Sequence, residues 1–179
     1  MYTDSVKAIV ITDDIIENLH TPAVAGWSQV KNDRLNTEHR ALLRLAQQHP
    51  AGVEVMAWYD DNLDSKIISV GTQGTVKADT SSGAIYIHNH PSGNTFTLKD
   101  VRHFLLRDNM KVLTAVGNNG IVYLLQKAEH YSFTEIYHSL QEIIQVTPDF
   151  EDSPEKYIDF MEKFLLNVRE YGLIYRKTR

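Results

Sequence analysis

Apolar and polar positions in the N-terminal part of the chain predict a strand followed by a helix. A short apolar run at residues 6–11 is typical of a β-strand. From Asn36 onward, leucines recur at helical spacing among charged neighbours, and Pro50 marks the end of this pattern. The segment between these two elements has no clear periodicity. We therefore expect one strand and one helix before residue 51.

Four short apolar runs further along the chain pair into two predicted hairpins. Residues 55–59 and 67–70 flank an acidic, turn-rich segment. Residues 112–116 and 121–125 flank a Gly-Asn-Asn-Gly sequence whose residues tolerate a positive φ. Each pair therefore predicts two antiparallel strands.

Between the two hairpins, the pattern changes from a strand to a helix. Residues 84–88 are typical of a buried strand, which should end near His90 because Pro91 cannot donate to a β-ladder. From Thr97 onward, apolar residues recur at helical spacing. We expect a strand, a tight turn and a helix over this stretch.

Two further helices are predicted near the C-terminus. Ser132 and Glu135 form a capping-box pattern ahead of an amphipathic stretch, and Ser153 followed by Pro154 is typical of a helix start. Gly172 lies where a left-handed helix cap would fall. Aromatic residues are frequent in this part of the chain, and we expect them to face the core or a partner protein.

These elements together predict an α/β fold with a mixed central β-sheet flanked by helices and followed by two C-terminal helices. We expect three parts. Residues 1–50 supply a strand and a helix leading into the domain, residues 51–128 form the core, and residues 129–179 form a C-terminal helical extension.

Composition narrows the function classes. The chain has 179 residues with 18 Lys plus Arg against 23 Asp plus Glu, a net charge of −5, so charge gives no support for nucleic-acid binding. It contains no cysteine, so a metal would have to be held by histidines and carboxylates. The apolar runs are too short for a signal segment or a membrane helix, and we expect a cytoplasmic protein with no membrane contact.

The chemistry-bearing residues lie at the end of the strand that precedes Pro91. His88 and His90 are two apart, so both imidazoles project from the same face of the strand. Asp100 falls in the first turn of the following helix, where side chains lean back toward the helix start. Two histidines and one carboxylate leave one tetrahedral position open, as in catalytic zinc sites. We expect Zn²⁺ here.

The other histidines show no comparable spacing. His103 follows Asp100 by one helical turn, and we expect a surface or supporting role for it. The remaining ones are expected to be solvated or to cap helices: His20, His39, His49, His130 and His138.

The run His-x-His-Pro-Ser-Gly followed by Thr-x-x-Asp resembles the JAMM/MPN metalloprotease motif, and His-Asn-His-Pro-Ser-Gly is most similar to its RadC-type branch. Similar HNHP modules occur on phage and toxin-associated proteins. The resemblance is specific over residues 85–105. It implies that residues 51–128 form a JAMM/MPN-like core that holds zinc through His88, His90 and Asp100 and hydrolyses a peptide or isopeptide bond.

The same resemblance implies two catalytic residues. A glutamate at the start of an upstream strand would act as the general base, and Glu54 has that position; Asp60 and Asp61 are less favoured substitutes. The Thr97 hydroxyl would stabilise a tetrahedral oxyanion. Equally, Glu54 could be a solvated residue beside a strand, and Thr97 and Asp100 could form only a helix cap.

Two features depart from the family pattern. Thr97 stands where serine is usual, which keeps the hydroxyl but adds a methyl group. Asp100 follows His90 by 10 residues, one fewer than expected for RadC-type sequences. The shorter spacer could displace the aspartate from the metal.

The sequence therefore predicts a zinc-dependent metallopeptidase or isopeptidase acting on a protein or peptide, with a ubiquitin-like protein among the candidate substrates. Two alternatives stay open. The chain could be an inactive binding module on the same scaffold, or a metal-dependent phosphoesterase with a second metal near His103.

Overall fold

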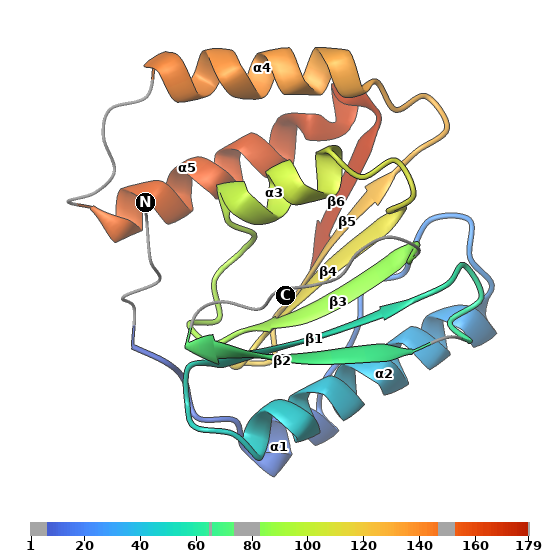
Figure 1. Cartoon of the computed structure of the whole chain (residues 1–179), viewed down its shortest axis with the longest axis vertical. Helices are drawn as coiled ribbons and strands as arrows, with labels where there is room; N and C mark the ends of the chain where they lie inside the picture. Colours follow the sequence, from blue (N-terminus) through green and yellow to red (C-terminus); the bar gives the residue numbers. More distant parts are fainter. Residues whose placement is uncertain (1–6, 65, 74–82, 147–152, 179) are drawn as a thin grey trace.

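The computed structural model of the chain describes residues 7–64, 66–73, 83–146 and 153–178. Helices and strands follow one another through this part of the chain (Figure 1). In order they are α1 (Asp13–Glu17), α2 (Gln29–Gln47), β1 (Val53–Tyr59), β2 (Ile67–Gln73), β3 (Ile85–His90), α3 (Leu98–Leu105), β4 (Val112–Gly117), β5 (Val122–Lys127), α4 (Phe133–Val146), α5 (Pro154–Asn167), the 3₁₀ helix η1 (Val168–Tyr171) and β6 (Leu173–Lys177).

The strands form one six-stranded sheet in the order β2-β1-β3-β4-β5-β6. β3 and β4 are parallel and are joined through α3, whereas every other neighbouring pair is antiparallel. Helices α1 and α2 lie on one side of the sheet, and α3, α4 and α5 lie on the other (Figure 1). The predicted α/β class, a mixed central sheet flanked by helices, is confirmed.

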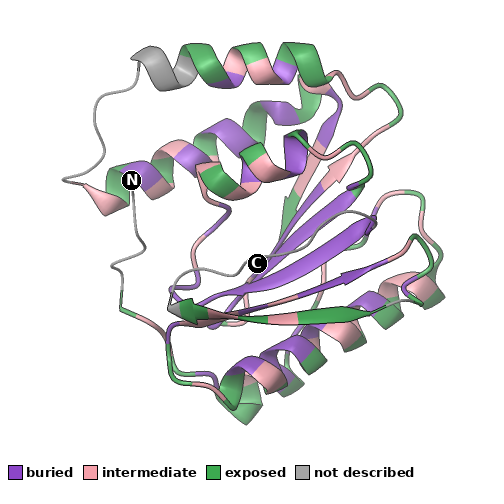
Figure 2. Ribbon diagram, viewed as in Figure 1, coloured by how far each residue is buried: buried purple, intermediate pink, exposed green. Residues whose placement is uncertain are grey.

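Side-chain alternation on β3 decides which layer each residue faces. Ile85 and Ile87 pack in the core under α2, whereas Tyr86 packs in the second core, under α3 and α5. All six residues of β3 are buried, and Figure 2 shows the buried strands at the centre of the sheet. Because side chains alternate along a strand, His88 and His90 share the face of Tyr86, toward α3.

Both predicted hairpins are present as β1 with β2 and β4 with β5. The predicted strand before Pro91 is β3, which ends at His90. Thr97 is the N-cap of α3, as its position before the amphipathic stretch predicted. The sequence predicts these elements correctly because turn-forming residues mark where each of them begins or ends.

The N-terminal prediction is partly wrong. The described part of the predicted first strand, residues 7–11, forms no strand, and Val6 lies outside the described residues. Helix α2 begins at Gln29 rather than near Asn36, with the Ser28 hydroxyl accepting from the Lys31 amide at 3.3 Å. Its first two turns are mostly polar, so hydrophobic periodicity does not reveal them.

The C-terminal region contains an element that the sequence analysis missed. Gly172 has a φ of 76° and caps η1, as expected, but the chain then continues as β6 and pairs with β5. A Cβ at Gly172 would lie 2.5 Å from Tyr131 Cα, so glycine is required there. Residues 129–179 therefore add a strand to the sheet as well as helices.

Candidate metal centre

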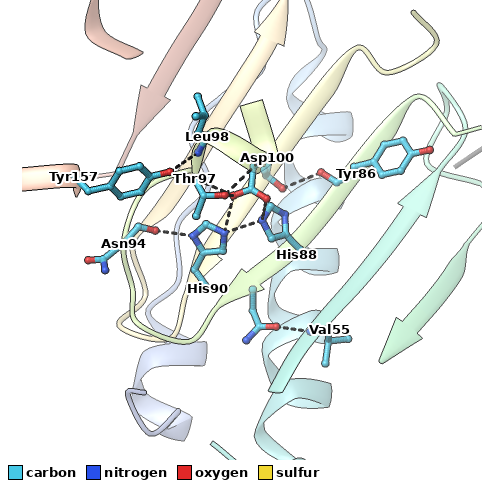
Figure 3. Close-up of polar contacts among 11 residues, drawn as sticks. Val55, Tyr86, His88, His90, Asn94, Thr97, Leu98, Asp100 and Tyr157 are labelled. Carbon is cyan, nitrogen blue, oxygen red and sulfur yellow. Dashed lines mark hydrogen bonds and ion pairs between the residues drawn. The ribbon is translucent and has the colours of Figure 1, made fainter. Parts of the chain in front are cut away.

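The candidate site lies where β3 ends and α3 begins, at the carboxyl ends of the two parallel strands, where α/β sheets commonly bind ligands. His88 and His90 come from β3, and Asp100 comes from the first turn of α3. Figure 3 shows the three side chains pointing toward one another beneath the start of α3. The structure therefore brings together the three residues predicted as metal ligands.

The three side chains offer ligand atoms that all lie within 4.8 Å of one another. His88 Nε2 and His90 Nε2 are 2.8 Å apart. His88 Nε2 lies 3.7 Å from Asp100 Oδ1, and His90 Nε2 lies 3.4 Å from Asp100 Oδ2. Although Asp100 follows His90 by only 10 positions, its carboxylate therefore still lies beside the two imidazoles.

A capping box fixes Asp100. Its Oδ2 accepts from the Thr97 amide at 2.8 Å and from the Thr97 hydroxyl at 2.6 Å, while the same hydroxyl accepts from the Asp100 amide at 3.2 Å. Thr97 and Asp100 thus form a helix cap, and the capped carboxylate is the same group that lies beside the two imidazoles. The cap holds the carboxylate against the imidazoles.

The imidazole of His90 is fixed by the turn that follows it. Its Nδ1 lies 2.8 Å from the Asn94 carbonyl oxygen and donates to it, which leaves Nε2 as the atom that can bind a metal. The turn itself needs Gly93, whose φ is 76° and whose carbonyl accepts from the Tyr123 hydroxyl at 2.9 Å. His88 Nδ1 is buried and makes no hydrogen bond of regular geometry with any described residue.

The site favours a positive charge at its centre. Burial, with the neighbouring His90, lowers the pKa of His88 to about 4. His90 is equally buried, but its bond to Asp100 and the negative charges of Asp100 and Glu54 outweigh burial and raise the pKa of His90 to about 9. Although burial opposes ionisation of Asp100, bonds from His90 and Thr97 keep the pKa of its carboxyl below the ordinary value.

The three candidate ligands differ in their exposure to solvent. Its side chain is 21% exposed, whereas the side chains of His88 and His90 are 4% and 6% exposed. Phe96, which is fully buried, closes the inner side, with its ring centroid 6.4 Å from that of His88 and 6.5 Å from that of His90. Both imidazoles are therefore buried beside Phe96, and Asp100 is the most exposed of the three candidate ligands.

Glu54 is the second residue of β1, the strand that pairs with β3. Met56, two residues later, pairs with His88, and the negative charge of Glu54 adds, after that of Asp100, to the raised pKa of His90. Asp60 and Asp61 follow the opposite end of β1, beyond the pairing of Tyr59 with Ile85. The structure therefore places Glu54, and not its two substitutes, beside the cluster.

Asn89, between the two histidines, holds the end of β1 in place, a role that the sequence analysis missed. It faces away from the metal site and accepts from the Val55 amide at 2.6 Å, while its amide group contacts the Val53 carbonyl at 3.4 Å. It also donates to Asn118 at 3.0 Å. These contacts hold the backbone of the residues on either side of Glu54. They join segments that are far apart in the sequence, so no local pattern predicts them.

Two expectations about the other histidines have different outcomes. His39 was expected to be solvated or to cap a helix, but it is fully buried, and its two ring nitrogens lie 2.7 Å from the Thr21 hydroxyl and 2.8 Å from the Thr114 hydroxyl. His103 packs edge-on against the Tyr86 ring. Within the described part of the chain, His103 belongs to no group of metal-binding side chains, so nothing favours a second metal beside it.

Comparisons with known proteins identify no relative: no family model, curated protein or solved structure matches the chain. Among the described residues, no helix is both long enough and apolar enough to cross a bilayer. The function must therefore be argued from the site itself.

Proposed function

We propose that the chain is a zinc-dependent hydrolase of the JAMM type that cleaves a peptide or isopeptide bond. The observation that carries the proposal is the convergence of His88 Nε2, His90 Nε2 and the Asp100 carboxylate within 4.8 Å. Glu54 lies two residues before Met56, which pairs with His88. A helix cap explains Thr97 and Asp100 alone, but it explains neither the buried imidazole pair nor the acidic residue at the end of β1.

The donor set fits zinc. Two imidazole nitrogens and one carboxylate are the protein ligands of many catalytic zinc sites, and they leave a position for water or substrate. The Asn94 carbonyl already fixes His90 with Nε2 toward the cluster. When bound, zinc would lower the pKa of a water molecule to about 7 and polarise a substrate carbonyl.

Glu54 is the proposed proton carrier. Water adds its oxygen to the substrate carbonyl carbon, and one of its protons passes to the Glu54 carboxylate. As the carbon–nitrogen bond breaks, Glu54 returns that proton to the leaving nitrogen. The products are an amine and a carboxylic acid, which keeps the second proton of the water. Glu54 is suited to this role because it stands at the end of β1, next to the ligand strand, where Asn89 holds the backbone on either side of it.

Thr97 takes a different role from the one the resemblance implied. Its hydroxyl donates a hydrogen bond to Asp100 Oδ2 at 2.6 Å. The hydroxyl proton is therefore not available to a reacting carbonyl. We assign Thr97 to the positioning of the Asp100 ligand. A hydroxyl is sufficient for this, which is consistent with threonine in place of the usual serine.

The test separates metal binding from catalysis. Purified wild-type protein should contain about one zinc per chain by elemental analysis, and His88→Ala and Asp100→Asn should contain none. Glu54→Gln should keep the zinc but lose at least about 100-fold of any hydrolysis of a peptide library, because proton transfer typically contributes 10²–10⁴-fold. His20→Ala, at an exposed histidine, is the matched control and should retain both properties.

Three outcomes distinguish the alternatives. Full zinc retention in both ligand variants would contradict the ligand assignment. Zinc binding without cleavage of peptide or isopeptide substrates would favour the binding module on the same scaffold. Equal hydrolysis by wild-type protein and Glu54→Gln would remove Glu54 from the mechanism.

A further inference from the structure

The start of β1, which contains Glu54, is held differently from the rest of the strand. Backbone pairing of β1 with β3 begins at Met56, opposite His88. One residue earlier, the Val55 amide donates to the Asn89 side-chain oxygen at 2.6 Å, the dashed contact that ends at Val55 in Figure 3. An asparagine side chain therefore takes the place of a backbone carbonyl of β3 directly after Glu54.

The pairing of β1 with β2 is also irregular at Glu54. Val53 pairs with Gln73 and Val55 pairs with Val70, so two residues of β2 lie opposite Glu54 alone. A bulge of this kind bends the strand and changes the direction of the side chain within it. Regular pairing is therefore interrupted on both edges of β1 at Glu54, and the Asn89 side chain provides a hydrogen bond there.

Asn89 is itself oriented by Asn118, the residue that follows β4. The Asn89 amide group donates to Asn118 Oδ1 at 3.0 Å, and Asn118 Nδ2 donates to the Ile9 carbonyl at 2.9 Å. The two asparagines are buried, with exposures of 0% and 3%. Loss of one partner would leave a buried amide unsatisfied, so each side chain depends on the other.

The two ends of this series of hydrogen bonds determine how both amide groups are turned. The Val55 N–H can only donate and the Ile9 carbonyl can only accept. Neither amide can therefore turn over without placing two donors or two acceptors against each other. Ile9 is also anchored, because its own amide donates to the Pro91 carbonyl at 2.8 Å. The Asn118 backbone amide donates to the His90 carbonyl at 3.0 Å, and a substitution of the side chain leaves this bond in place.

We infer that Asn118 is a positioning residue that acts through Asn89 to fix the backbone on either side of Glu54. The inference rests on the proposed hydrolase function and deepens it. Removal of the Asn118 side chain should displace the proton carrier and leave the three metal ligands in place. A role confined to the turn after β4 would lower stability without a specific effect on Glu54.

Residue-resolved hydrogen exchange of the zinc-free protein tests the position of this segment without any need for activity. In the wild type, the Val55 amide should exchange as slowly as the other amides of β1. In Asn118→Ala it should exchange about tenfold faster relative to those amides, because the Asn89 side chain loses its orienting partner. Asn119→Ala is the matched control in the same turn, since Asn119 bonds to Gly93 and Ile121 instead, and it should keep the wild-type pattern.

A cycle of two substitutions tests the effect on catalysis. Asn118→Ala should lower kcat by about tenfold while KM and zinc content stay unchanged, because small displacements of a catalytic group slow the chemical step. In the Glu54→Gln background the same substitution should cause no further loss, since residues that act as a unit are not additive. Asn119→Ala should retain the wild-type kcat.

The outcomes separate this inference from the proposed function. Fast exchange at Val55 in the wild type, or unchanged relative exchange at Val55 in Asn118→Ala, would overturn the inference; the first of these measurements needs no variant to fold. Equal losses of kcat from Asn118→Ala with and without Glu54 would also overturn it. All three results leave the proposed metal centre standing. Absence of hydrolysis by the zinc-loaded wild type would overturn the proposed function and the positioning role together.

Discussion

Two buried histidine sites lie on opposite faces of the same sheet, and they differ in their partners. On the α2 face, the ring nitrogens of His39 lie within hydrogen-bond distance of the hydroxyls of Thr21 and Thr114, and burial lowers its pKa to about 3. On the α3 face, His90 lies against Asp100, and its pKa rises to about 9 despite equal burial. Burial alone therefore does not decide the charge of a histidine; the carboxylate does.

This contrast separates a histidine with complete neutral partners from the candidate metal-binding pair. Both ring nitrogens of His39 have neutral partners, so the site is complete as it stands. The pair on β3 instead keeps two Nε2 atoms 2.8 Å apart beside a carboxylate, an arrangement that a cation stabilises and neutral imidazoles do not require. The first site should matter for folding and the second for metal binding.

The largest effect on the free energy of unfolding is expected from a substitution of His39. His39→Ala leaves a cavity and two buried hydroxyls without their partner, so the free energy of unfolding should fall by about 2–5 kcal/mol. Urea unfolding monitored by circular dichroism measures this loss. Zinc content per folded chain should not change, and a loss of zinc equal to that in His88→Ala would show that the two faces are not separate in function.

Because His39 is buried in its neutral form, the free energy of unfolding should depend on pH. The pKa of His39 is lowered to about 3 in the folded chain, whereas the ordinary value is 6.5. As pH falls below 6.5, the unfolded chain takes up a proton at this residue and the folded chain does not, until about pH 3. The stability of the folded state therefore decreases with falling pH across this window, by up to about 1.4 kcal/mol per pH unit.

Urea unfolding of zinc-free protein at pH 7, 6 and 5 tests this slope. His39→Gln retains hydrogen-bonding capacity but cannot titrate in this range, so its stability should decline less steeply than that of the wild type. Parallel slopes for the two proteins would show that His39 does not stay neutral in the folded state.

The smallest change is expected at the cap that holds Asp100. Thr97→Ala removes the hydroxyl that accepts from the Asp100 amide and donates to its carboxylate, so stability should fall by about 1 kcal/mol. Zinc affinity, measured by competition with a chelator, should weaken by about 10–100-fold because the ligand loses its orienting partner. Thr97→Ser should preserve both values; a variant with the stability loss but unchanged zinc affinity would reduce Thr97 to a helix cap.

Sequence patterns predicted the convergence of the three candidate ligand residues because local geometry determines their arrangement. Alternation along a strand places His88 and His90 on one face, and the N-cap at Thr97 fixes where the first turn containing Asp100 begins. No distant contact is needed to anticipate either feature. The fold class followed in the same way from hairpins bounded by turn residues.

Other features depend on segments that are far apart in the sequence. Asn89 holds Val55 through a side-chain contact across 34 positions, and His39 reaches Thr114 across 75. Helical spacing does place His39 on the apolar face of α2, one turn from Leu35 and Leu43, but its hydroxyl partners lie in other elements and have no local signal. Strand β6 has only five residues and is stabilised by pairing with β5, so its own sequence signal is short.

The most direct test of the metal centre is a crystal structure of the zinc-soaked protein with anomalous data collected at the zinc edge. The account predicts one strong peak about 2.0–2.2 Å from His88 Nε2, His90 Nε2 and an Asp100 carboxylate oxygen, with Glu54 facing the remaining position. A peak bound elsewhere, or no peak between these three side chains at a saturating zinc concentration, would contradict it.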